Sequence, residues 1–121
     1  MICIGIVGDV SENFISQIEN RYIEYGYSVY LYCGSRAASD IGSCLAEAER
    51  LCKEVFISKT DSYGILKFDI LIFNNIDKKK ILSKMKNIKP NGYAIINADD
   101  CSIFPYILPE NVNIIKRGIN I

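Results

Sequence analysis

The turn after the first apolar run of the chain is its strongest candidate for chemistry. Residues 2–7 are continuously apolar and end at Gly8-Asp9, which is typical of a buried strand that leads into a helix. A phosphate-binding turn here needs several glycines, a lysine and a magnesium-binding hydroxyl, and a dinucleotide turn needs G-x-G-x-x-G. No lysine follows Gly8, and Asp9 and Glu12 occupy the helix end that would attract an anion. We expect an ordinary strand–turn–helix with acidic residues at the helix N-terminus and with Ser11 or Asp9 as its cap, and a phosphate site is the alternative.

Carboxylates that could hold a divalent cation follow a later apolar run. Asp99 and Asp100 come shortly after Asn97, and Asp9 follows the first run. Carboxylates at strand ends bind Mg²⁺, but they also form turns and cap helices. We expect turn formation and capping here. A metal site is the alternative, and it requires these three carboxylates to converge.

Histidine is absent from the chain, and the cysteines are scattered. The absence of histidine excludes His-based acid–base catalysis, Ser-His and Cys-His dyads and His-ligated metals. The five cysteines form no C-x-x-C pair, so we expect neither a zinc site nor a disulfide framework. Cys44 and Cys52 fall on a helical pattern, and we expect them to be small core residues in a reducing compartment.

Length and composition indicate one globular domain that covers residues 1–121. Half of the residues are apolar, and 14 basic side chains balance 14 acidic ones. A neutral chain is not expected to bind nucleic acid or a membrane surface, because such proteins usually carry a basic excess. The N-terminus lacks a basic segment and a cleavage site, and no apolar run is long enough to span a membrane. We therefore expect a cytoplasmic protein.

Strands and helices are expected to alternate along the chain. The expected strands cover residues 2–7, 27–33, 54–57, 69–73, 93–97 and 112–116, and the expected helices cover about 11–25, 40–53 and 77–88. Residues 58–68 are expected to form a polar loop, and 90–92 a turn. Alternation of this kind favours parallel pairing through right-handed crossovers. The sequence thus predicts an α/β fold with an open, mostly parallel, Rossmann-like or P-loop-like sheet of about five or six strands and helices on both faces.

Loops at the carboxyl ends of these strands should supply any binding site, because open α/β sheets bind ligands there. The four loops are Gly8 to Ser11, Gly34 to Arg36, Asn74-Asn75 and Asn97 to Asp100.

Two side-chain clusters allow an interaction surface. Six lysines lie between residues 78 and 89, and three of them open a helix whose dipole disfavours cations there. We expect a solvated helix face, with a weak patch for an anionic partner as the alternative. Five tyrosines bracket one helix–strand junction, namely Tyr22, Tyr25, Tyr27, Tyr30 and Tyr32. We expect core and edge packing there, with a homodimer or partner surface as the alternative.

Several segments resemble the central ATPase domain of the Mur ligase superfamily, which consists of ATP-dependent amide-bond ligases of cell-wall synthesis. Residues 89–100 (K-P-N-G-Y-A-I-I-N-A-D-D) are similar to a family strand that ends in N-x-D-D. Residues 69–77 resemble its D-x-x-x-x-T-N-I strand, 62–65 the tail of its E-x-S-S-x-G-L segment, 4–8 the strand before its phosphate loop, and 114–119 a strand further downstream. The resemblance implies a weak nucleotide site that would use Gly8, Asp9, Ser11, Asn74, Asn97 and Asp99.

The chain departs from that family where triphosphate and metal would be held. The phosphate-loop lysine is missing after Gly8, the magnesium-binding glutamate falls at Lys59, and the histidine of D-H-L-D is missing after Asn75. The flanking domains of the ligases do not fit within 121 residues. The resemblance therefore implies a degenerate, non-catalytic domain that acts as a binding or regulatory module. It is expected to have no tightly bound cofactor, ATP and magnesium included.

Two other functions stay open. One is a small divalent-metal-dependent enzyme on a Rossmann- or flavodoxin-like sheet, which would use Asp9, Asp99 and Asp100. The other is a dimerising structural module that would use the tyrosine-rich junction.

Overall fold

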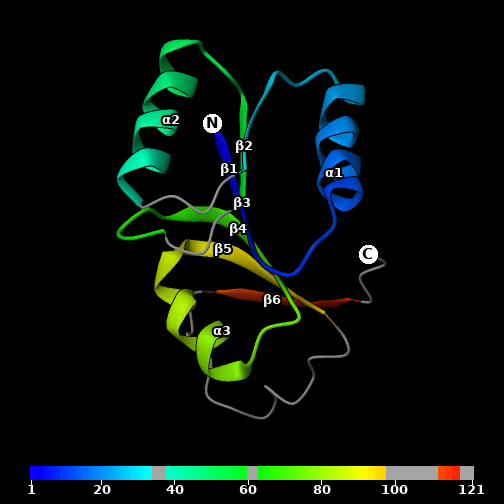
Figure 1. Cartoon of the computed structure of the whole chain (residues 1–121), viewed down its shortest axis with the longest axis vertical. Coiled ribbons are helices and arrows are strands. Elements are labelled where there is room, and N and C mark those ends of the chain that lie inside the picture. The colour runs from blue at the N-terminus through cyan, green and yellow to red at the C-terminus, as the bar shows by residue number, and fades with distance from the viewer. Residues whose placement is uncertain (34–37, 60–62, 98–111, 118–121) are drawn as a thin grey trace.

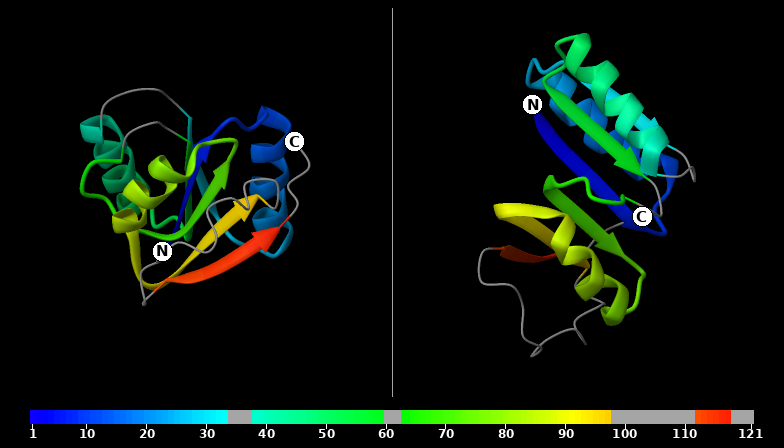
Figure 2. Two further views of the ribbon diagram at one scale, coloured as in Figure 1. Left: turned by 90° about the horizontal axis from the view of Figure 1, so that it is seen from below. Right: turned by 90° about the vertical axis from the view of Figure 1, so that its left-hand side faces the viewer.

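Six strands form one entirely parallel sheet in the computed structural model, which describes residues 1–33, 38–59, 63–97 and 112–117. The strands are β1 (Ile2–Gly8), β2 (Val29–Cys33), β3 (Val55–Lys59), β4 (Phe68–Asn74), β5 (Ile88–Asn97) and β6 (Asn113–Arg117). They lie in the order β2-β3-β1-β4-β5-β6, and Figure 2 shows β5 and β6 side by side with the same direction. The predicted open α/β sheet is confirmed.

Helices cover both faces of this sheet, as expected. α1 (Glu12–Glu24) lies on one face, and α2 (Ala38–Arg50) and α3 (Lys78–Lys84) lie on the other (Figure 1). Ile15 of α1 packs among strand residues such as Ile4 and Ile57. Ile41 of α2 and Ile81 of α3 belong to the larger core cluster on the opposite face. No helix within the described ranges is long and apolar enough to span a membrane.

The junction between α3 and β5 differs from the prediction. The α-helix ends at Lys84, a 3₁₀ turn covers Met85–Asn87, and β5 already begins at Ile88. The expected turn at 90–92 lies inside β5, where it forms a bulge. Phe68 pairs with Ile88 and Ile70 pairs with Tyr93, so four residues of β5 lie opposite one residue of β4. Asn91 adopts a positive φ of 66°, and Gly92 packs so closely that a Cβ would lie 2.8 Å from the Asp69 carbonyl oxygen. These turn-forming residues bend the strand without ending it.

The C-terminus of α2 corrects the expectation for Cys52, which is exposed and not part of the core. Its φ is +56°. The Cys52 N–H donates to the Glu49 carbonyl, and the Lys53 N–H donates to the Ala48 carbonyl. This pair of bonds is the Schellman arrangement, in which glycine is the preferred residue at the left-handed position. A side chain at that position strains the backbone.

Replacing Cys52 with glycine is therefore expected to stabilise the fold. The unfolding free energy should rise by about 0.5–1 kcal/mol. Glycine releases the strain of the left-handed backbone, and its greater freedom in the unfolded chain offsets part of that gain. Urea denaturation would measure it. Cys52→Ala is the matched control, because it removes the thiol and keeps the Cβ. A glycine variant no more stable than the alanine variant would contradict this explanation.

Candidate functional site

The site lies where β1 and β4 end side by side at the carboxyl edge of the sheet. After β1 the chain forms α1 and returns to the sheet on the side of β1 where β3 lies. After β4 it forms α3 and returns on the side of β4 where β5 lies. The two helices lie on opposite faces (Figure 1), so the strand order reverses between β1 and β4. This is the switch point at which open α/β sheets bind ligands. The structure brings together here the predicted residues Gly8, Asp9 and Ser11 from one loop and Asn74 from the other.

Backbone and side-chain bonds join the two loops. The Asp9 N–H donates to the Asn74 carbonyl at 3.1 Å, and the Asn74 side-chain amide donates to the Asp9 carbonyl at 2.5 Å. Asn74 is buried. Asn75, with a positive φ of 54°, donates its side-chain amide to the Asp9 carboxylate at 3.0 Å. Asp9 is therefore held through its N–H, its carbonyl and its side chain.

Gly8 is required by this closed geometry. Its φ is +103°, and a Cβ at this position would overlap the Asn74 carbonyl oxygen and lie 2.6 Å from the Ile76 side chain. In phosphate-binding loops the small size of glycine lets the backbone approach a ligand. Here the same property lets β1 approach the end of β4. Protein atoms thus occupy the space directly beside Gly8.

Two side chains of the turn also differ from those of a phosphate site. Ser11 is the N-cap of α1, and its hydroxyl oxygen accepts the Phe14 N–H at 3.1 Å, so capping by Ser11 is confirmed. Asp9 is exposed and brings a carboxylate to the switch point, where it would repel a phosphate. Of the two cap candidates, Ser11 caps α1 and Asp9 links the loops.

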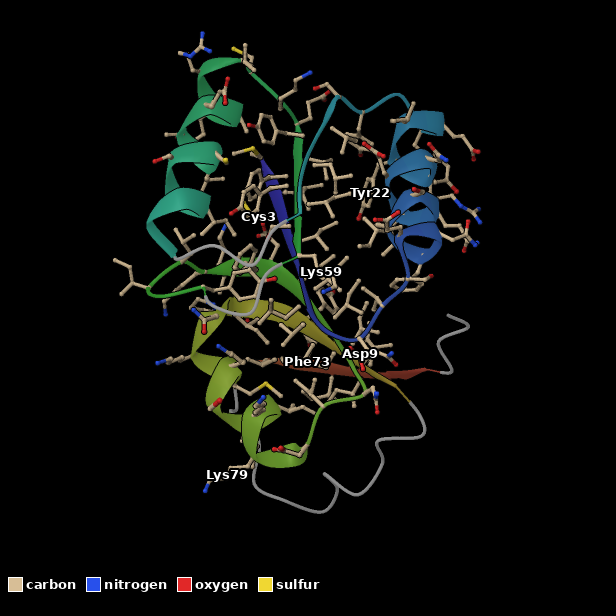
Figure 3. The ribbon with its side chains drawn as sticks, viewed as in Figure 1. Cys3, Asp9, Tyr22, Lys59, Phe73 and Lys79 are labelled. Atoms are coloured by element: carbon tan, nitrogen blue, oxygen red, sulfur yellow. The ribbon has the colours of Figure 1, made fainter. Side chains whose placement is uncertain are left out.

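Lys59 ends β3 at the same edge of the sheet, next to β1. It pairs in register with Ile6, and it is half-buried. Alternation along β3 places Lys59 on the α1 face with Val55 and Ile57, in agreement with Figure 3. The family pattern has a glutamate at this position, and a glutamate would bind a divalent cation. The lysine found here instead repels one.

The other predicted site residues are only partly placed. Asn97 ends β5, where it pairs with Arg117, but its side chain and both Asp99 and Asp100 lie outside the described residues. Convergence of Asp99 or Asp100 with Asp9 stays a prediction. Within the described part of the chain, no group of three or more His, Cys, Asp or Glu side chains could hold a metal ion.

Tyr63 completes the packing at this edge. It belongs to the segment for which the sequence predicts a polar loop. It is fully buried on the α2 face, with its ring edge-to-face against Phe68 at 4.6 Å. Its hydroxyl accepts the Ile6 N–H at 3.0 Å and donates toward the carbonyls of Ile6 (2.8 Å) and Ser58 (3.2 Å). It thereby links the backbones of β1 and β3. Gly5 leaves room for Leu71 and for Tyr63, since a Cβ there would lie 2.5 Å from the Leu71 side chain and 3.2 Å from the hydroxyl.

The five tyrosines of the predicted junction do not form one surface. Tyr22 and Tyr27 pack edge-to-face at 5.8 Å, and Tyr22 belongs to the α1 side of the sheet. Tyr30 stacks on Phe56 on the α2 side of the sheet. Its hydroxyl donates to the Glu47 carboxylate, and this hydrogen bond is the main reason that the pKa of Tyr30 is raised to about 12. Tyr32 is buried, whereas Tyr25 is 71% exposed. Packing on two faces accounts for most of this cluster. Homodimerisation through Tyr25 stays a prediction.

Comparisons of the chain with models of known protein families, with curated proteins and with solved structures found no match.

Replacing Tyr63 with phenylalanine is expected to destabilise the protein by about 1–3 kcal/mol, because the buried Ile6 N–H loses its partner. Urea denaturation would measure the change in unfolding free energy. Tyr25→Phe removes an exposed hydroxyl and should change it by less than about 0.5 kcal/mol. Equal effects of the two substitutions would show that the Tyr63 hydroxyl does not link β1 and β3.

Proposed function

We propose that this chain is a non-catalytic, Mur-ligase-like domain that acts as a binding or regulatory module in the cytoplasm. In this proposal it binds nucleoside triphosphate weakly at most. The observation that carries the proposal is the closed junction between the β1–α1 turn and the end of β4. A triphosphate needs free backbone N–H groups and cationic side chains at this place. The Asp9 N–H is already bonded to Asn74, and the Asp9 carboxylate supplies the opposite charge.

The electrostatics of the neighbouring strand support the same proposal. Phosphoryl transfer depends on positioning and on charge stabilisation by lysine and magnesium. Lys59 stands where a metal-binding carboxylate would be expected, and Ser11 is engaged as a helix cap. Opening a phosphate site would require breaking the bonds of Asp9 to Asn74 and Asn75. The energy of nucleotide binding would have to offset their loss.

The cytoplasmic part of the proposal rests on the cysteines. Cys3, Cys44 and Cys52 are all free thiols. Disulfides are rare in reducing compartments, so unpaired cysteines agree with a location inside the cell.

Calorimetric titration of the full chain with ATP and magnesium tests the nucleotide part of this proposal. The dissociation constant is expected to be weaker than about 1 mM, which corresponds to about −4 kcal/mol. Asp9→Asn removes the negative charge and keeps a side-chain oxygen for Asn75, so it should tighten binding by at most about tenfold. Micromolar, magnesium-dependent binding by the unmodified chain would refute a closed phosphate site.

A further inference from the structure

The turn between Tyr63 and β4 holds a large apolar side chain out in solvent. Ile65 is 95% exposed. Both flanks of the turn are fixed, because the buried Asn87 donates its side-chain amide to the carbonyls of Gly64 (3.0 Å) and Leu66 (2.7 Å). The Leu66 N–H also donates to the Tyr63 carbonyl. Because Ile65 is presented on an already ordered turn, its burial by a partner would require little additional loss of entropy.

A single exposed isoleucine is common on protein surfaces and carries no inference alone. The second observation is the charge around it. Lys67 directly follows Leu66, and Lys86 directly precedes Asn87, so the Asn87 hydrogen bonds join the two backbone segments that carry these lysines. Lys79 and Lys80 extend the positive charge along α3 by about 10 Å, at 1.5 Å per residue. All four lysines are exposed, and Figure 3 shows Lys79 pointing away from the helix.

No ion pair within the described ranges accounts for these lysines. None of the four forms an ion pair with another residue of the described ranges. Asp77 precedes α3, where it serves as the N-cap and accepts the Lys80 N–H at 2.9 Å. Lys79 and Lys80 lie in the first helical turn, where the dipole disfavours cations. Residues that break a local rule without a structural gain are candidates for function.

We propose that Ile65, Lys67, Lys79, Lys80 and Lys86 form a docking surface, here called the Ile65–lysine surface, for an acidic segment of a protein partner. Ile65 would enter an apolar pocket of the partner, and the lysines would pair with carboxylates around it. This inference rests on the proposed function as a binding module. It specifies the surface and the chemistry of the partner.

A protein partner fits this surface better than a membrane or a nucleic acid does. Membrane-surface helices need a broad apolar face, but Ile81 of α3 and Met85 of the 3₁₀ turn after it lie in the core. Surfaces for single-stranded nucleic acid usually interleave aromatic side chains with basic ones, and the Ile65–lysine surface contains none. An apolar anchor with a polar rim is the arrangement of a protein interface, and lysines at the rim select an acidic partner.

Nuclear magnetic resonance titration of the ¹⁵N-labelled full chain tests this proposal. The probe is a capped synthetic peptide of glutamate and leucine residues. Its addition is expected to shift the amides of residues 64–67 and 79–87, and binding should weaken as salt is raised. A single-stranded oligonucleotide and vesicles that contain phosphatidylserine are the competing probes. The proposal is overturned if the peptide leaves these amides unchanged, or if either competing probe binds them more tightly.

Two variants separate the contribution of the apolar anchor Ile65 to peptide binding from that of the lysine charges. Ile65→Ser is expected to weaken peptide binding about tenfold or more, because the apolar contact is lost. Lys79→Glu with Lys80→Glu should weaken it by a similar factor, while the helix becomes no less stable because acidic residues suit its first turn. The controls are Leu51→Ser and Lys53→Glu at the far end of α2, and they should leave binding unchanged. Equal weakening by the controls would overturn the proposal.

Three further outcomes are also decisive. If Ile65→Ser changes the oligomeric state of the chain alone, the surface binds a second copy, and the proposal of a separate acidic partner is wrong. Failure of the peptide to bind, together with absent ATP binding, would reject the surface and leave the proposed non-catalytic role intact. Tight ATP binding would reject that role whatever the peptide does.

Discussion

The contact between the β1–α1 turn and the end of β4 is the constraint on which the site depends. Gly8 and Asn74 are paired in the parallel ladder, and Asp9 continues the contact beyond the strand through its backbone and its carboxylate. In an open α/β sheet this position is normally a crevice. Here hydrogen bonds join Asp9 of one loop to Asn74 and Asn75 of the other. The element that would bind phosphate instead joins two halves of the sheet.

A second link lies on the other side of β1. The Tyr63 hydroxyl connects the backbones of β1 and β3, and its ring fills the space above Gly5. The two glycines of this strand, Gly5 and Gly8, therefore serve close packing inside the protein. β1 is joined at its carboxyl end to both neighbouring strands. Such an arrangement favours a rigid scaffold, which suits a module that presents a surface such as the turn at Ile65.

The sequence predicted the elements that depend on local patterns. Continuous apolar runs identified the strands, and the apolar spacing that includes Ile15 and Ile41 belongs to helices that do cover the sheet. The loops of Gly8 and Asn74 were correctly expected at one edge. Contacts that depend on distant residues were not predictable. Tyr63 sits in a polar stretch whose pattern does not indicate that its hydroxyl reaches Ile6, 57 residues earlier. The bulge of β5 lies where the sequence predicts a turn, because bulges and turns use the same residue types.

Amide hydrogen exchange at Asp9 tests most directly whether the switch point is closed. Its N–H should exchange slowly, at a rate close to that of amides in the middle of β1 and β4, because it is bonded to the Asn74 carbonyl. Addition of ATP and magnesium should leave that rate unchanged. An Asp9 amide that exchanges as fast as an exposed loop and is slowed by ATP would show that the turn is open and binds nucleotide.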